Sequence, residues 1–150
     1  MSNVLAGIGR GQMEVLDDRI SQRRANFSRY HNFFEAWNAK GYEIKFQEEN
    51  AISFANRWLS CILIDPLKNR GLSREKIRLA LEEDNIESRP LWKPMHLQPV
   101  FQGSQFFGEG VCERLFEIGL CLPSGSNLAE NDFERIFKAL NQIFSKAQSN

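Results

Sequence analysis

The stretch 58–64, Trp-Leu-Ser-Cys-Ile-Leu-Ile, limits most strongly what this chain can fold into. It is nearly continuous in apolar residues, which predicts a central β-strand covered on both faces. Asp65 and Pro66 end the strand. A helix from Ser73, a suitable N-cap, to Asp84 and a short strand at 86–89 follow. Strand, helix and strand within about thirty residues form a βαβ-like unit, so the sequence favours an α/β fold.

Residues 1–40 predict one long helix, with Gly41 as its C-cap. From residue 12 to residue 39 the helix would measure about 42 Å. A compact domain of this size has a diameter of about 38 Å. We therefore expect part of the helix to pack against something outside the chain. Its apolar stripe, which Arg23 and Arg24 interrupt, consists of Leu16, Ile20, Phe27, Tyr30, Phe34 and Trp37.

Three glycines stand in alternate positions at 7–11. They do not form a phosphate-binding loop, because no strand precedes them, the spacing is GxGxG, and no Lys-Ser/Thr pair follows. We expect them to permit close helix packing instead.

The remaining pattern completes an α+β domain with a few-stranded, mostly antiparallel sheet around 58–64. The expected helices at 74–84 and 129–146 cover this sheet, and Asn127 with Glu130 is a capping-box variant for the last helix. One domain results, with a linking helix at 1–40 and a small α/β body at 41–150. The other expected elements are strands at 42–46 and 120–122, a functional or interfacial loop at 90–110, and a helix at 111–118.

Charge and composition exclude several classes of protein. Lys plus Arg and Asp plus Glu both number 19, so no basic excess is available for nucleic acid or an anionic membrane surface. No apolar run approaches the ~20 residues of a membrane helix, and no signal peptide is present, so we expect a cytoplasmic protein. Cys61, Cys112 and Cys121 are expected to be buried thiols. With only His31 and His96, zinc ligands would be scattered, and we expect no metal.

The loop at 90–110 and its flanks hold the candidate binding residues: Arg89, Trp92, Lys93, His96 and Gln98. Arginine binds carboxylate or phosphate through a planar fork, and a neighbouring aromatic ring can stack on a ligand. Histidine titrates near neutrality or donates a hydrogen bond. The alternative is structural: Arg89 pairs with a carboxylate and His96 caps loop carbonyls. The same two interpretations apply to Asn56-Arg57-Trp58.

Four segments together resemble the DegT/DnrJ/StrS sugar aminotransferases, and they occur in the order found in that family. They are MSNVLAGIGRGQ at 1–12, NRWL at 56–59, NIESRPLWKPMHLQPVF at 85–101 and GLCLPSG at 119–125. The resemblance implies the small C-terminal domain of a pyridoxal-phosphate enzyme of the aspartate-aminotransferase fold (fold type I). It also implies a homodimer acting on nucleotide-linked keto-sugars for polysaccharide biosynthesis, with glutamate as amino donor.

The resemblance also implies what this chain lacks. The family's Schiff-base lysine, the acid that pairs with the pyridine nitrogen and the main phosphate loop would lie upstream, so we expect no catalytic residue, no bound cofactor and no activity of the chain alone. Arg89, Trp92, His96 and Gln98 correspond to the segment facing the substrate. Two alternatives stay open: a half-enzyme completed by a separate N-terminal chain, and a stand-alone oligomerising module.

Overall fold

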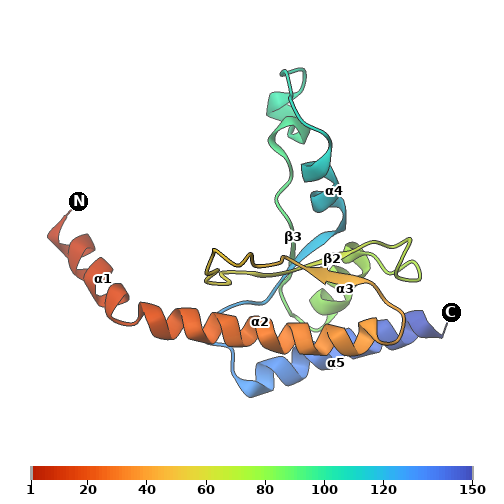
Figure 1. Cartoon of the computed structure of the whole chain (residues 1–150), viewed down its shortest axis with the longest axis horizontal. Coiled ribbons are helices and arrows are strands. Elements are labelled where there is room, and N and C mark those ends of the chain that lie inside the picture. The colour runs from red at the N-terminus through yellow and green to blue at the C-terminus, as the bar shows by residue number, and fades with distance from the viewer. Residues whose placement is uncertain (1, 150) are drawn as a thin grey trace.

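The apolar run at 58–64 supplies β2 (Ser60–Ile64), an inner strand of a four-stranded antiparallel sheet with the order β1-β2-β4-β3. The structure is a computed structural model that describes residues 2–149, and Met1 and Asn150 lie outside the described residues (Figure 1). The other elements are α1 (Asn3–Glu14), α2 (Leu16–Asn38), β1 (Ile44–Phe46), α3 (Arg74–Glu83), β3 (Arg89–Pro90), η1 (Met95–Leu97), η2 (Pro99–Phe101), α4 (Val111–Ile118), β4 (Gly119–Leu122) and α5 (Glu130–Gln148).

The predicted βαβ-like unit is present in a split form. β2 and β3 both pair antiparallel with β4, which lies between them, and α3 connects them. In β2 the side chains of Ser60, Ile62 and Ile64 are buried, whereas Cys61 and Leu63 on the other face are half-buried. The expectation that both faces would be covered therefore holds fully for one face only.

The core lies between the buried face of the sheet and the helices α2 and α5 (Figure 1). Tyr30, Phe34 and Trp37 of α2 are buried, as the predicted stripe requires. The Phe144 ring of α5 lies 5.1 Å from the Trp37 ring and 5.8 Å from the Phe34 ring, between centroids. Rings at these separations bury large areas and add about 0.5–1.5 kcal/mol per pair.

The prediction of one long N-terminal helix is wrong, because the helix breaks at Val15, whose φ of −114° and ψ of 9° are not helical. α1 projects away from the body of the molecule (Figure 1) and buries none of its residues. The expected close packing at Gly7, Gly9 and Gly11 is also absent from the described residues, since nothing lies within 4 Å of a Cβ built at any of them. Because α1 is rich in glycine and buries no residue, few interactions stabilise it as a straight continuation of α2.

The cap of the last helix differs from the prediction. Ala129, not Asn127, is the N-cap of α5, and its backbone N–H donates to Oδ2 of Asp132 at 2.9 Å. The Asn127 side chain lies instead beside Gly125, whose added Cβ would meet Oδ1 of Asn127 at 2.5 Å.

The segment from 91 to 118 projects from the sheet as an arm made of η1, η2 and α4 (Figure 1). The predicted helix at 111–118 is confirmed, and the predicted loop contains two short 3-10 turns. None of the helices described has the length and apolar character needed to cross a membrane.

Candidate functional site

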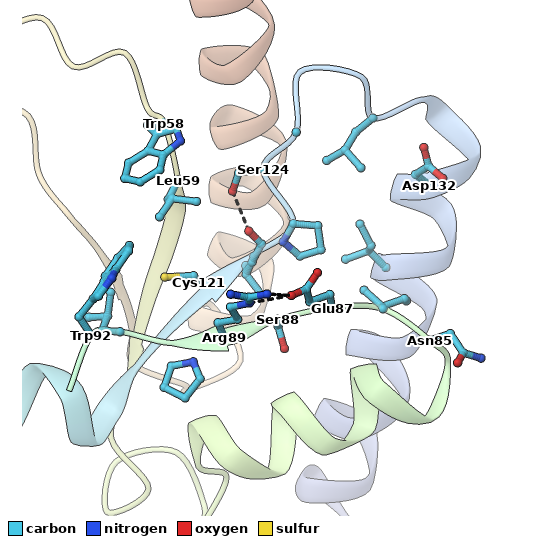
Figure 2. Close-up of a pocket in the computed structure, with 18 of the residues that line it drawn as sticks. Trp58, Leu59, Asn85, Glu87, Ser88, Arg89, Trp92, Cys121, Ser124 and Asp132 are labelled. Atoms are coloured by element: carbon cyan, nitrogen blue, oxygen red, sulfur yellow. Dashed lines mark hydrogen bonds and ion pairs between the residues drawn. The ribbon is translucent and has the colours of Figure 1, made fainter. Parts of the chain in front are cut away.

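A cavity of about 810 Å³ opens beside the edge strand β3 (Figure 2). Its walls come from five parts of the chain: Trp58 and Leu59 before β2, the segment 85–93, Phe116 of α4, the end of β4 with the turn that follows, and α5. The volume suits a small organic ligand, and the walls are largely apolar with a few charged groups. The segment 85–93 holds Arg89, Trp92 and Lys93, three of the five residues that the sequence singled out, so the cavity is the candidate functional site.

Two exposed tryptophans flank one side of the cavity. The rings of Trp58 and Trp92 lie 6.2 Å apart between centroids and are tilted by 34°. Their residues are 59% and 68% exposed, although an indole side chain is normally covered. Flat apolar rings left open at a cavity mouth provide a surface on which a ligand ring can stack.

Arg89 stands on the same cavity wall and is paired with a neighbouring carboxylate (Figure 2). Its Nε donates to Oε1 of Glu87 at 2.6 Å, and its Nη2 lies 2.5 Å from the same oxygen. Arg89 therefore makes the carboxylate pair that the structural interpretation of this residue predicted. The Arg89 side chain is 78% exposed, so this pair is solvated and contributes little to stability. An incoming anion can replace Glu87 at low cost.

Arg57 has a structural role in this chain. Its Nη1 donates to the carbonyl oxygen of Gln47 at 2.8 Å, and its guanidinium lies 3.9 Å from the centroid of the Phe27 ring. With 11% of its side chain exposed, Arg57 offers no free fork to a ligand. Asn56 accepts from the Trp58 backbone N–H at 3.0 Å and so turns the chain into the tryptophan.

The structure separates His96 and Gln98 from the cavity that Arg89 and Trp92 line. Both lie on the arm, where Nε2 of Gln98 donates to the carbonyl oxygen of Lys93 at 3.3 Å. Nε2 of His96 lies 2.6 Å from Oε1 of Glu113. The four predicted binding residues therefore form two groups in this chain rather than one.

The surroundings of His96 fix the direction of its ring. The imidazole stacks on Phe106 at 3.7 Å between centroids and is held by Glu113 of α4. Hydrogen bonds from the Cys112 thiol, from the Glu113 backbone N–H and from His96 lower the pKa of Glu113 below its usual value. Glu113 was not predicted from the sequence, because seventeen positions separate it from His96 and only the fold of the arm brings the two together.

Two expectations about metal ligands and thiols need correction. His96, Cys112 and Glu113 are not scattered, since their ligand atoms all lie within 4.8 Å of one another. His96 and Cys112 each hydrogen-bond to the Glu113 carboxylate, at 2.6 and 3.1 Å, so the set is a hydrogen-bonded cluster. Only Cys121 is buried; Cys61 is half-buried and Cys112 is exposed.

Arg23 of α2 hydrogen-bonds to two of the residues that line the cavity. It donates from Nη1 to the carbonyl oxygens of Trp58, at 2.5 Å, and Ser124, at 3.2 Å. The hydroxyl of Ser124 in turn accepts from the backbone N–H of Ser60 at 2.8 Å. These bonds join the two strand ends that form the cavity wall. In the sequence, Arg23 stands out only as an interruption of the apolar stripe.

The profile of the DegT/DnrJ/EryC1/StrS aminotransferase family matches residues 1–141 of this chain. The chain belongs to this family. Among curated relatives of this DegT-family chain, EpsN of Bacillus subtilis (strain 168), named as a pyridoxal phosphate-dependent aminotransferase, is 43% identical over 148 residues. GDP-perosamine synthase of Escherichia coli O157:H7 is 27% identical over 145 residues. The two alignments cover 96% and 97% of this chain but only 36% and 37% of the relatives, so the chain spans just over a third of their length.

Solved structures give the same result for the fold of this DegT-family chain. DesI, solved in the presence of its TDP-sugar product, aligns with a TM-score of 0.81 at 20% identity, over 99% of this chain and 37% of its own. An aminotransferase from Psychrobacter cryohalolentis aligns with a TM-score of 0.81 at 18% identity, over 99% of this chain and 40% of its own. The predicted fold, a small α/β domain of an aspartate-aminotransferase-like enzyme, is confirmed.

Proposed function

We propose that this chain is the small-domain portion of a pyridoxal-phosphate aminotransferase that acts on nucleotide-linked keto-sugars, with glutamate as amino donor. The family match over residues 1–141 carries the proposal, together with 43% identity to EpsN. The relatives named for GDP-perosamine and for a TDP-sugar product support nucleotide sugars as the substrate class.

In this proposal the cavity beside β3 is part of the substrate pocket. Arg89 binds an anionic group, either the carboxylate of the donor or the diphosphate of the nucleotide sugar, and leaves Glu87 when it does so. Trp92 and Trp58 provide a stacking wall for a planar group of the ligand. His96, oriented by Glu113, contacts the sugar, and Gln98 shapes the loop.

The residues of the cavity do not by themselves fit pyridoxal phosphate. The cofactor needs a lysine in a sheltered position for its imine and a carboxylate beside its ring nitrogen. Among the residues described, the one lysine that lines the cavity is Lys93, which is exposed on the arm. Glu87 and Asp132, the acids of the cavity, already accept hydrogen bonds from Arg89 and from the Ala129 backbone. The cofactor would therefore be held by the large domain or by a partner chain, and this chain alone would be inactive.

The exposed apolar side chains of α1 support a partner for this portion. Val4 is 72% exposed and Met13 is 68% exposed, and no residue of α1 is buried. A large domain, in the same chain or in a separate one, would cover this helix. The same observation favours the second candidate, an oligomerising module. Size measurement of the purified chain distinguishes them, because the module would form a defined oligomer that the Ile8→Asp substitution dissociates.

A chimaera tests the proposed function. In it, this chain replaces the matching portion of EpsN, and transamination of nucleotide-linked keto-sugars by glutamate is measured. We expect turnover by the chimaera and none by the isolated chain. Arg89→Ala should raise the Michaelis constant for donor or sugar, whereas Arg78→Ala, on the surface of α3, should not. A folded chimaera without turnover on any nucleotide sugar, or unchanged kinetics of Arg89→Ala, would contradict the proposal or the assignment of Arg89.

A further inference from the structure

We propose that Cys61 and Cys121 form a reactive dithiol site that hydroperoxides convert to an intramolecular disulfide across the centre of the sheet. The two residues are direct partners in the antiparallel pairing of β2 with β4, and their sulfur atoms lie 3.5 Å apart. Sixty positions separate them in the sequence, so only the sheet brings them together. The inference does not depend on the proposed aminotransferase function.

The backbone geometry permits the bond. Residues directly opposite in an antiparallel pair have Cα atoms about 4.5 or 5.5 Å apart. Both separations fall within the range of about 4.4–6.8 Å that disulfides span. Paired side chains also leave the sheet on the same face, so the two Cβ atoms do not point apart. The pairing is therefore compatible with an S–S bond of about 2.05 Å.

The site is open to a small oxidant. Cys121 is buried but lines the cavity beside β3 (Figure 2). Cys61 is half-buried. Arg89 is the partner of Cys121 on β3, so Cys61, Cys121 and Arg89 form one row on the face opposite the core.

The hydrogen bond between the sulfur atoms gives the two thiols different roles. The bond between the two sulfur atoms raises the pKa of the Cys61 thiol, with a further contribution from burial. The same bond lowers the pKa of Cys121. Cys121 also lines the cavity, whereas Cys61 does not, so Cys121 is the nucleophile in this proposal and Cys61 is the resolving thiol held next to it.

The reaction balances in two steps. The Cys121 thiolate attacks the terminal oxygen of the hydroperoxide, the O–O bond breaks, and a sulfenic acid and an alcohol form; hydrogen peroxide gives water in place of the alcohol. The Cys61 sulfur then attacks the sulfenic sulfur, the S–S bond forms, and the S–O bond breaks with loss of water. The two thiols lose two electrons and two protons, and the peroxide accepts both.

The test uses the chain with Cys112→Ser, because this substitution removes the exposed thiol and leaves only the proposed pair. The chain is treated with one equivalent of hydrogen peroxide, and free thiols, intact mass and a non-reducing peptide map are measured. We expect both thiols to disappear together, a mass loss of two hydrogen atoms, a cross-linked peptide joining Cys61 to Cys121, and full reversal by dithiothreitol. The product should remain a single chain.

Matched variants complete the test. In the Cys112→Ser background, neither Cys61→Ser nor Cys121→Ser should lose two hydrogen atoms. Cys61→Ser keeps the proposed nucleophile Cys121 and should gain oxygen or link two chains, and Cys121→Ser should do so more slowly because it keeps only Cys61. The far-ultraviolet circular dichroism of each reduced variant checks its fold, and either variant alone is sufficient for the comparison. Three results would overturn the proposal: both thiols persist, one thiol is consumed without the other, or the paired chain gains oxygen as the single-thiol variants do.

Discussion

The Arg23 guanidinium donates to the backbone carbonyl oxygen of Trp58, which lies thirty-five positions later in the chain. The same nitrogen, Nη1, donates to the carbonyl oxygen of Ser124. Arg23 of α2 thus joins the segment before β2, which carries Trp58, to the turn after β4, which carries Ser124. The position of Trp58 relative to Trp92 depends on this side chain.

Replacement of Arg23 by Met keeps the apolar stem but removes both hydrogen bonds. We expect a loss of about 1–2 kcal/mol in the free energy of unfolding, because the carbonyl oxygens of Trp58 and Ser124 lose their charged hydrogen-bond donor. The fluorescence of Trp58 should also change. Denaturant unfolding followed by tryptophan fluorescence measures both effects. Arg19→Met is the control, because within residues 2–149 the Arg19 side chain hydrogen-bonds only to Gln22 in the next turn of α2. A change above about 0.5 kcal/mol in this control would show that the substitution acts through the helix itself.

Glu49 predicts a pH dependence of stability. Hydrogen bonds from Arg24 and from the Ala55 backbone N–H lower its pKa to about 2, from an ordinary value of 4.5. Because the folded state holds the carboxylate ionised, the stabilisation is complete above pH 4.5 and is lost as the pH falls from about 4.5 to about 2. Denaturant unfolding at a series of pH values should show this slope.

The slope should largely disappear in Glu49→Gln and persist in Glu48→Gln. The neighbouring Glu48 is exposed, and its side chain makes no hydrogen bond or ion pair within residues 2–149. Equal slopes for the wild type and Glu49→Gln would show that Glu49 is not the group responsible.

Gly119 and Gly9 should respond to alanine in opposite directions. A Cβ at Gly119 would lie 2.5 Å from the carbonyl oxygen of Leu115 and would collide with the Leu91 side chain. Since Leu115 contributes backbone there, we expect Gly119→Ala to destabilise the fold by about 1–3 kcal/mol. Gly9 has nothing within 4 Å of its Cβ, so Gly9→Ala should favour helix in α1 by about 1 kcal/mol. Circular dichroism with denaturant unfolding tests both, and a destabilising Gly9→Ala would reveal an unseen contact.

Phe144 should dominate the stability of the core. It is fully buried, and its ring lies 5.2 Å from the Tyr42 ring in addition to its contacts with α2. Phe144→Ala should cost about 3–5 kcal/mol in the free energy of unfolding, through lost burial and the cavity left behind. Phe107→Ala is the matched control, because Phe107 is 83% exposed on the arm. We expect it to change stability by less than about 0.5 kcal/mol, and equal effects of the two substitutions would contradict the assignment of the core.

The apolar patterns predicted α2, α5 and β2 because each pattern places its apolar side chains on a face that must be buried. The period of α2 and α5 and the run in β2 require a buried face, and Ser73 accepts from the Lys76 backbone N–H as an N-cap should. The strand ends were less well predicted, since β3 is only Arg89–Pro90 against the expected 86–89. Strand limits depend on the partner strand, which in this case is β4.

The candidate site was predicted only in part. Of the predicted binding residues, Arg89 and Trp92 line the cavity, whereas His96 and Gln98 lie on the arm. Trp58 joins Trp92 from across the sheet, and Glu113 joins His96 from the next helix. Neither pairing has a local pattern, because both depend on the path of the chain between distant elements.

By itself, the sequence determined the α/β class, the family and the identity of Arg89 and Trp92 as cavity residues, since these follow from local apolar periodicity and from a contiguous motif. Only the tertiary structure decided that α1 breaks from α2 at Val15, that Arg89 pairs with Glu87, and that Cys61 lies against Cys121. The physical reason is the same for all three. A helix break, an ion pair and a cross-strand contact all depend on which groups lie next to a residue in three dimensions. The spacing of residues along the chain does not determine those neighbours.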